Sequence, residues 1–174
     1  MTSELWSSNQ KERLKKGFYD LEKYTLILIV PASLALFVFP KLIITLLFGS
    51  NYASGYIAMR ILSLSIIFLT IYVINQSVLM GIGKPNEASK ILFKVALFNL
   101  IANFILIPFL GIIGAAITTT IGYVLLSIFT FKKLKKLIKI KLDLILGLKL
   151  TVSAVIFVII VNYLRYILIL NQYL

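Results

Sequence analysis

The sequence predicts an all-α protein, a polytopic membrane helix bundle with about five transmembrane helices, and three observations support this fold class. Hydrophobic residues make up 60% of the 174 positions and charged residues 14%, with a mean hydropathy of +1.02. A soluble domain carries about 25% charged residues, because its surface must present polar groups to water. The second observation is a series of long apolar stretches, and the third is the placement of lysines between them.

Five apolar stretches are long enough to cross a bilayer, since about 20 helical residues span its hydrocarbon core of about 30 Å. Pro31 and Pro40 interrupt the first stretch, so we expect a kinked helix whose last part, residues 42–48, lies near the interface. Pro108, Gly111 and Gly114 separate the third stretch from the fourth, which predicts a tight hairpin in which Pro108 ends the third helix and the two glycines permit the turn. The predicted spans are residues 24–48, 57–80, 91–110, 112–131 and 148–170.

The basic residues predict an orientation. Residues 1–23 carry five of them, residues 81–94 three and residues 132–149 seven, which is fifteen of the eighteen lysines and arginines. The two connections that alternate with these segments carry none. Because cytoplasmic loops are rich in lysine and arginine, we expect residues 1–23 to form a cytoplasmic amino-terminal segment. Residues 24–174 then form a single domain in the cell membrane with an external carboxyl terminus.

Two of the basic segments have features that predict further structure. Leu134, Leu137 and Ile138 share a helical face, so residues 132–141 could rest on an anionic membrane surface. The alternative is a cytoplasmic loop whose lysines follow the charge bias of membrane topology. Residues 1–23 have no apolar core typical of a signal peptide, and we expect a loop or a short amphipathic helix there.

The residue types that are absent exclude most catalytic chemistry. The chain has no cysteine and no histidine, so it lacks disulfides, thiol nucleophiles, a Ser/His/Asp triad and the usual zinc ligands. We therefore expect no enzyme activity, no metal and no cofactor. The net charge of +12 raises the question of nucleic acid, but the lysines lack interleaved aromatic residues that would stack on bases. Membrane lipids are the expected partners, and nucleic acid is not.

Four side-chain amides lie within the predicted spans, where an unpaired polar group is costly. Asn75 and Gln76 fall in the inner half of the second span, and Asn99 and Asn103 lie four residues apart on one face of the third. One interpretation is that these amides line a polar cavity for the hydroxyl groups of a sugar. The other is that they form hydrogen bonds between helices and hold the bundle together.

Three basic side chains near the ends of the spans are candidates for contact with a lipid phosphate. Lys94 lies about one turn into the third span, and Arg60 and Lys41 flank the connection between the first two spans. The alternative for Lys94 is that its ammonium group extends to the headgroups simply to remain hydrated. Arg60 and Lys41 could likewise do no more than mark the membrane interface.

Small residues recur every four positions along the fourth span, at Gly114, Thr118 and Gly122. Such a stripe lets another helix approach closely, so we predict a packing role. The glycines of Gly81-Ile-Gly-Lys84 match neither a complete dinucleotide fingerprint nor a P-loop, and nucleotide binding is not predicted.

Particular segments also resemble a known family. They are Leu47-Phe-Gly-Ser-Asn-Tyr52, Leu79-Met-Gly-Ile-Gly-Lys-Pro-Asn86, and Leu106-Ile-Pro-Phe-Leu-Gly-Ile-Ile-Gly-Ala-Ala-Ile-Thr118 after the Asn99 and Asn103 pair. In this order they are similar to the carboxyl-terminal half of polysaccharide biosynthesis proteins, the oligosaccharide-lipid flippases of the multidrug/oligosaccharidyl-lipid/polysaccharide exporter superfamily. The resemblance extends over nearly the whole chain.

The resemblance implies part of a MATE-like exporter lobe. Members of this superfamily have two lobes around a central cavity and move lipid-linked sugars by alternating access. This chain matches part of the second lobe, so we expect a partial or split transporter that exports lipid-linked oligosaccharide with a separate first-lobe polypeptide. The alternatives are a multidrug or cation exporter of the same superfamily and a non-transporting membrane subunit or inactive fragment. The exporter alternative is weakened because the spans contain no carboxylate.

Overall fold

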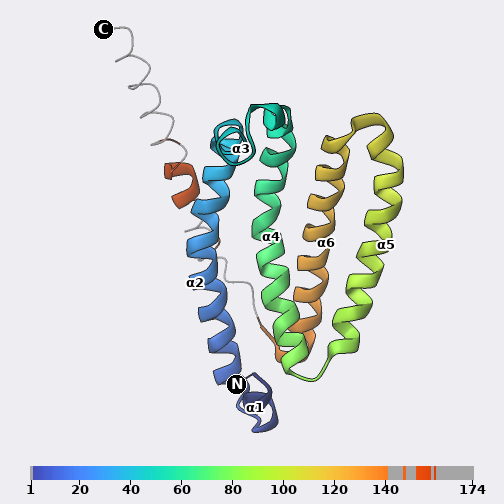
Figure 1. The fold of residues 1–174 in the computed structure, drawn as a ribbon. Helices are drawn as coiled ribbons and strands as arrows, with labels where there is room; N and C mark the ends of the chain where they lie inside the picture. The colour runs from blue at the N-terminus through green and yellow to red at the C-terminus, as the bar shows by residue number, and fades with distance from the viewer. Residues whose placement is uncertain (1, 141–146, 148–151, 158, 160–174) are drawn as a thin grey trace.

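A computed structural model describes residues 2–140, 147, 152–157 and 159, and every regular element in this part of the chain is helical (Figure 1). The all-α prediction is therefore confirmed for the described residues. Four segments are long and apolar enough to cross a membrane: Lys11–Val38, Ser50–Gly81, Pro85–Leu110 and Ile112–Ile138. The fifth predicted span, 148–170, lies largely outside the described residues. The elements are α1 (Thr2–Ser7), α2 (Lys11–Val38), α3 (Pro40–Phe48), the 3-10 helix η1 (Ser50–Gly55), α4 (Tyr56–Gly81), α5 (Pro85–Leu110) and α6 (Ile112–Ile138).

The four long helices stand side by side in the order α2, α4, α6, α5 (Figure 1). The closest association is between α4 and α6, followed by the pairs α5 with α6 and α2 with α4. Helix α4 is therefore central, whereas α5 packs mainly against α6 and leaves most of its surface exposed. The short helix α3 lies across one end of the bundle beside the start of α4.

The first membrane-crossing segment differs from the single kinked helix that we expected over residues 24–48. Helix α2 begins at Lys11, so more than half of residues 1–23, where we expected a loop or a short amphipathic helix, belongs to the first long helix. Pro31 lies inside α2, and the helix ends instead at Val38, before Phe39, whose φ of −114° and ψ of 39° are not helical. Pro40 has no N–H to donate, but it fits the first position of a helix, where no donor is needed. It accordingly begins α3 rather than continuing α2.

The predicted hairpin between the third and fourth spans is present, and Gly111 alone makes the turn. Its φ of 55° and ψ of −134° are accessible to glycine and to almost no other residue. Its N–H donates to the carbonyl of Ile107, at 2.8 Å, and closes α5. Pro108 does not end the helix as expected, because α5 continues to Leu110. A proline in the last turn removes a single ladder hydrogen bond, which the structure tolerates here.

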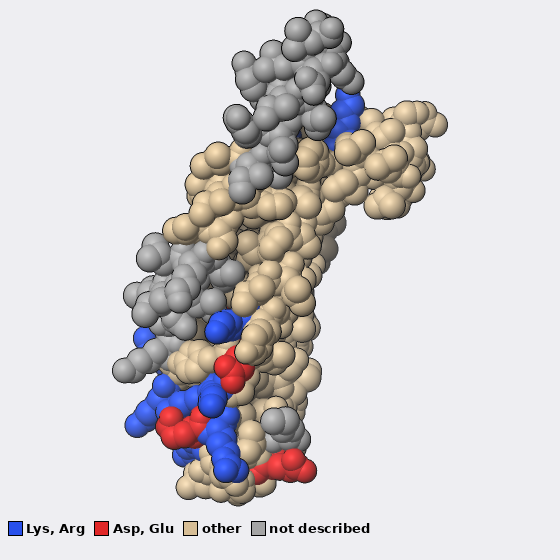
Figure 2. Space-filling model, turned by 90° about the vertical axis from the view of Figure 1, so that its left-hand side faces the viewer, with Lys and Arg blue, Asp and Glu red and all other residues tan. Residues whose placement is uncertain are grey.

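Charged side chains gather at one end of the bundle (Figure 2), which we call the lysine-rich end. It consists of α1, the start of α2, the α4–α5 connection and the end of α6. Lys133 and Glu87 form an ion pair at 2.7 Å that joins the end of α6 to the start of α5. Sequence segments far apart in the chain therefore bring their lysines to the same end, as the alternating charge pattern requires.

The core of the lysine-rich end is built from α1, α2, α4 and α6 together. Leu134 and Ile138 are buried against Leu14, Phe18 and Leu79. The interpretation that Leu134 and Ile138 face a membrane surface is therefore wrong. Their helical face points into the bundle because the start of α2 and the end of α4 lie at the same level and offer apolar side chains there.

Candidate functional site

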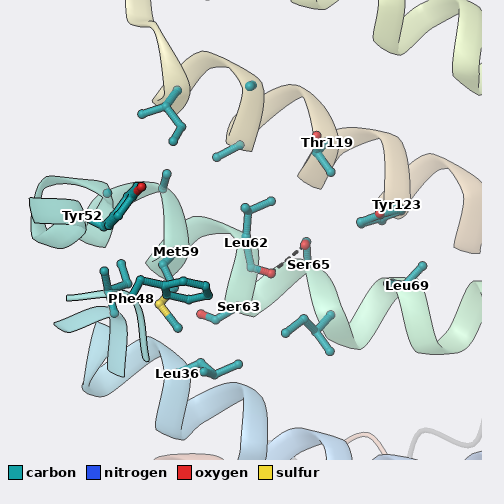
Figure 3. A pocket seen from close by; sticks show the side chains of 17 residues that line it. Leu36, Phe48, Tyr52, Met59, Leu62, Ser63, Ser65, Leu69, Thr119 and Tyr123 are labelled. Atoms are coloured by element: carbon teal, nitrogen blue, oxygen red, sulfur yellow. Dashed lines mark hydrogen bonds between the residues drawn. The ribbon is translucent and has the colours of Figure 1, made fainter. Parts of the chain in front are cut away.

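A hollow of the described residues, which we call the groove, lies at the end opposite the lysines. It has a volume of about 850 Å³ and runs between the first halves of α4 and α6, with α3 and η1 at its mouth (Figure 3). Most of its lining is apolar. The lining residues are Leu36, Ile44, Phe48, Tyr52, Gly55, Ala58, Met59, Leu62, Ser63, Ser65, Ile66, Leu69, Ile112, Ala115, Ala116, Thr119 and Tyr123.

Some of the hydroxyl groups in the groove already donate hydrogen bonds to backbone carbonyls of the helices. Ser63 donates to the carbonyl of Arg60 at 2.7 Å, and Ser65 donates to the carbonyl of Leu62 at 2.6 Å. Thr119 and Tyr123 come from α6 and lie across the groove from the α4 side chains (Figure 3). The groove therefore suits a long apolar chain with few polar groups better than it suits a sugar.

Asn75, a candidate either for a sugar cavity or for hydrogen bonding between helices, is buried between α4 and α6. Its Nδ2 donates to the hydroxyl of Thr130 at 3.3 Å, and that hydroxyl donates in turn to the carbonyl of Leu126 at 2.7 Å. The Oδ1 atom of Asn75 is buried without a hydrogen-bond partner in the described part of the chain. Gln76 is the next residue on α4, is half-buried, and faces a different direction. Neither amide is among the residues that line the groove.

Asn99 and Asn103 share one face of α5, as predicted, and this face meets α6. Asn103 Nδ2 donates to Asn99 Oδ1 at 3.0 Å, and the hydroxyl of Thr118 donates to Asn103 Oδ1. This chain of hydrogen bonds crosses from α5 to α6. Asn103 also borders a small apolar hollow of about 270 Å³ on the surface of α5. Both amides are half-buried, and their geometry favours the helix-packing interpretation over the sugar-cavity interpretation.

The small residues of α6 lie opposite these amides. A Cβ atom added to Gly114 would lie 2.6 Å from the carbonyl oxygen of Leu106, a distance that forces the helices apart. A Cβ added to Gly122 would lie 3.6 Å from Asn99 Nδ2, which is ordinary contact. The structure therefore brings the predicted packing stripe and two of the predicted cavity amides into one α5–α6 interface.

Of the three candidates for contact with a lipid phosphate, Lys94 lies at a different end of the molecule from Arg60 and Lys41. Lys94 is exposed on α5 towards the lysine-rich end. Arg60 lies near the start of α4, where its Nε donates to the carbonyl of Phe37 at 3.2 Å. Its guanidinium carbon lies 5.6 Å from the ring centroid of Phe37 and 6.0 Å from that of Tyr56. Lys94 and Arg60 therefore do not belong to one site.

The groove itself was not predicted, although one sequence signal pointed to part of it. Phe48 and Tyr52 belong to a segment that carries the family resemblance, and both line its mouth. No comparable sequence signal indicated that α6 also lines the groove, because the pairing of α4 with α6 depends on tertiary contacts. Among the described residues, no group of acidic, histidine or cysteine side chains is arranged to hold a metal ion.

Sequence comparison relates the chain to curated membrane proteins. It is 45% identical over 139 residues, 80% of the chain, to an uncharacterised membrane protein of Methanocaldococcus jannaschii, and covers 27% of that protein. It is 27% identical over 137 residues, 78% of the chain, to a Haloferax volcanii protein named a probable low-salt glycan biosynthesis flippase, and covers 29% of it. It is 33% identical over 93 residues, 52% of the chain, to a capsular polysaccharide biosynthesis protein of Staphylococcus aureus, and covers 24% of it.

These matches extend over most of the chain but little of each relative. The chain spans about a quarter of the length of the curated relatives it matches. No family model matches it, and no solved structure does. The four apolar helices and the membrane-protein relatives together indicate a multi-pass helical membrane protein.

Proposed function

We propose that this chain forms part of a flippase-type transporter that moves lipid-linked oligosaccharide across the cell membrane during polysaccharide or glycan export. The observation that carries the proposal is the similarity over 78% of the chain to the Haloferax volcanii protein named as a glycan biosynthesis flippase. The similarity to a capsular polysaccharide biosynthesis protein supports the same class of substrate.

The contrast between the ends of the bundle supports a transport role. Alternating access requires a path that is open at one side of the membrane and closed at the other. In this chain the groove makes one end of the bundle hollow, while buried apolar side chains such as Leu79 and Leu134 fill the lysine-rich end. The apolar lining of the groove suits the hydrocarbon part of a lipid-linked substrate, which must stay away from water.

The proposed role requires no covalent chemistry, so the chain is not an enzyme in this proposal. It needs a second lobe, supplied by the remaining spans of a complete transporter, because a central cavity forms between two halves. The lysine-rich end lies in the cytoplasm, and the groove opens towards the outer leaflet. The multidrug or cation exporter alternative lacks a carboxylate within the apolar part of the described helices.

Reconstitution tests the proposal. The full chain is placed in liposomes that contain a fluorescent lipid-linked oligosaccharide, alone and with a polypeptide that supplies the remaining spans. Fluorescence that a membrane-impermeant reductant can reach reports translocation. We expect translocation in the combined sample, slowed by Thr119→Phe, which fills the groove, but not by Ile121→Phe on the exposed side of the same helix.

The other interpretations predict different results in the same assay. Transport of a cationic dye without transport of the sugar lipid would support the exporter alternative. Stable association with the second polypeptide but no transport of either substrate would support a non-transporting subunit, and would contradict the proposal.

A further inference from the structure

A second hollow is lined by the first half of α3 and the start of α4. It has a volume of about 660 Å³, and we call it the cationic pocket. Two basic side chains, Lys41 from α3 and Arg60 from α4, contribute to its lining. The remaining lining residues are Val38, Phe39, Pro40, Leu42, Thr45 and Tyr56. The pocket exists because the chain turns at Phe39 and places the start of α3 beside the start of α4.

Arg60 is held in this pocket by its inner nitrogen. Nε donates to the carbonyl of Phe37, one of the last carbonyls of α2, and the guanidinium lies near the rings of Phe37 and Tyr56. The two outer nitrogens make no hydrogen bond within the described residues. An arginine fixed in this way presents a planar pair of donors, the geometry that matches two oxygens of a phosphate.

Among the residues that the structure describes, no acidic side chain lies near the positive charge of the pocket. The acidic residues that the structure describes lie in α1, the first half of α2 and the first turn of α5, all towards the lysine-rich end. Lys41 and Arg60 are also the two described basic residues that lie at the other end. Placing two cations there runs against the charge bias of the rest of the chain. An anionic ligand would offset the electrostatic repulsion between the two cations.

The surroundings of the pocket indicate the rest of the ligand. Helix α3 lies across the end of the bundle (Figure 1) and exposes large apolar side chains. Leu46 is 74% exposed and Leu47 is 70% exposed. A short helix with such an exposed apolar surface, beside basic side chains, is suited to the boundary between lipid headgroups and hydrocarbon chains.

We propose that Lys41 and Arg60 bind the phosphate group of a membrane lipid in the cationic pocket. Either an anionic phospholipid or an isoprenoid lipid phosphate presents this chemistry. The site goes beyond the proposed function, because a lipid phosphate would bind there whether or not the chain takes part in sugar export.

Binding to the full chain in detergent micelles tests this site. The probe is a fluorescently labelled phosphatidic acid, and fluorescence anisotropy reports its dissociation constant. Labelled diacylglycerol, which has no phosphate, serves as the negative control and is expected to bind weakly. Unlabelled phosphatidylglycerol, polyprenyl monophosphate and inorganic phosphate then compete in separate arms, and the strongest competitor identifies the source of the phosphate.

The variants assign the binding to the pocket. We expect the double variant Lys41→Gln/Arg60→Gln to weaken binding about tenfold or more, since each charge-assisted contact to a phosphate is worth about a tenfold change. Arg60→Lys should retain part of the affinity. The matched control Lys135→Gln/Lys136→Gln removes two exposed charges from the lysine-rich end and should bind as the parent chain does.

Equal binding by the double variant and the parent chain would overturn the proposal. So would equal loss in the double variant and the matched control, because the effect would then follow net charge alone. If the double variant does not fold, Lys41→Gln decides, since the structure gives Lys41 no side-chain hydrogen bond to lose. Unchanged affinity in that variant would equally overturn the site.

Discussion

The two ends of this helix bundle are packed differently. At the lysine-rich end, side chains from α2, α4 and α6 interlock, and Leu79 and Leu134 are completely buried. At the other end the same helices enclose the groove and the cationic pocket, and Leu46 remains exposed. The difference begins at Pro40, where the chain leaves the line of α2 and runs across the bundle as α3. Hydrophobicity alone therefore does not decide where a membrane bundle is solid and where it is hollow.

The largest expected effect concerns the sides of the membrane on which the two ends lie. The chain has no cysteine, so Ser54→Cys and Asn86→Cys each introduce a unique thiol at an exposed position at opposite ends of α4. A membrane-impermeant maleimide should label Ser54→Cys in intact cells and Asn86→Cys only after lysis, because lysine-rich segments remain cytoplasmic. The reverse labelling pattern would invert the proposed orientation of the groove.

Core truncation should distinguish the packed end from the hollow end. Leu79→Ala removes a completely buried side chain, and we expect it to lower the free energy of unfolding in detergent by about 2–5 kcal/mol, because a cavity remains. Leu46→Ala, at an exposed position, should change it by less than about 0.5 kcal/mol. Equal effects would mean that the two ends are packed alike. Denaturant titration followed by circular dichroism measures both values.

Substitutions in the α5–α6 interface should change the unfolding free energy by less, and they test the distance between the two helices directly. Gly114→Ala places a methyl group against the backbone of Leu106, and the resulting overpacking should cost about 1–3 kcal/mol. Gly122→Ala meets Asn99 and Val95 at contact distance and should change the unfolding free energy by less than about 0.5 kcal/mol. The same denaturant titration compares the two variants. A tolerated Gly114→Ala would show that α5 does not approach α6 this closely.

A small net effect is expected at Asn75, because two contributions oppose each other there. Leucine in its place would lose a long hydrogen bond to Thr130, but would also remove the buried Oδ1 that has no partner among the described residues. These contributions oppose each other, so the unfolding free energy should change by less than about 1 kcal/mol. A loss of more than about 2 kcal/mol would show that Oδ1 has a partner in the folded protein.

Several features of the structure could be predicted from local properties of the sequence. The length of apolar stretches indicated the four described membrane-crossing helices, and the positions of lysines indicated which connections share one end. Gly111 was predicted at the hairpin, because a tight turn often needs a residue free to adopt positive φ. Residue spacing also placed Asn99 and Asn103 on one face of α5. It placed Gly114, Thr118 and Gly122 on one face of α6.

Other features depended on contacts between distant segments. They include the end of α2 at Phe39, the burial of Leu134, the pairing of α4 with α6, and the groove that results. The physical reason is the solvent. In water an apolar stripe marks the face that packs inward, but in a bilayer lipid and protein are both apolar. Membrane insertion thus follows from composition and charge along the chain, whereas shape complementarity between helices decides which faces meet and where space remains.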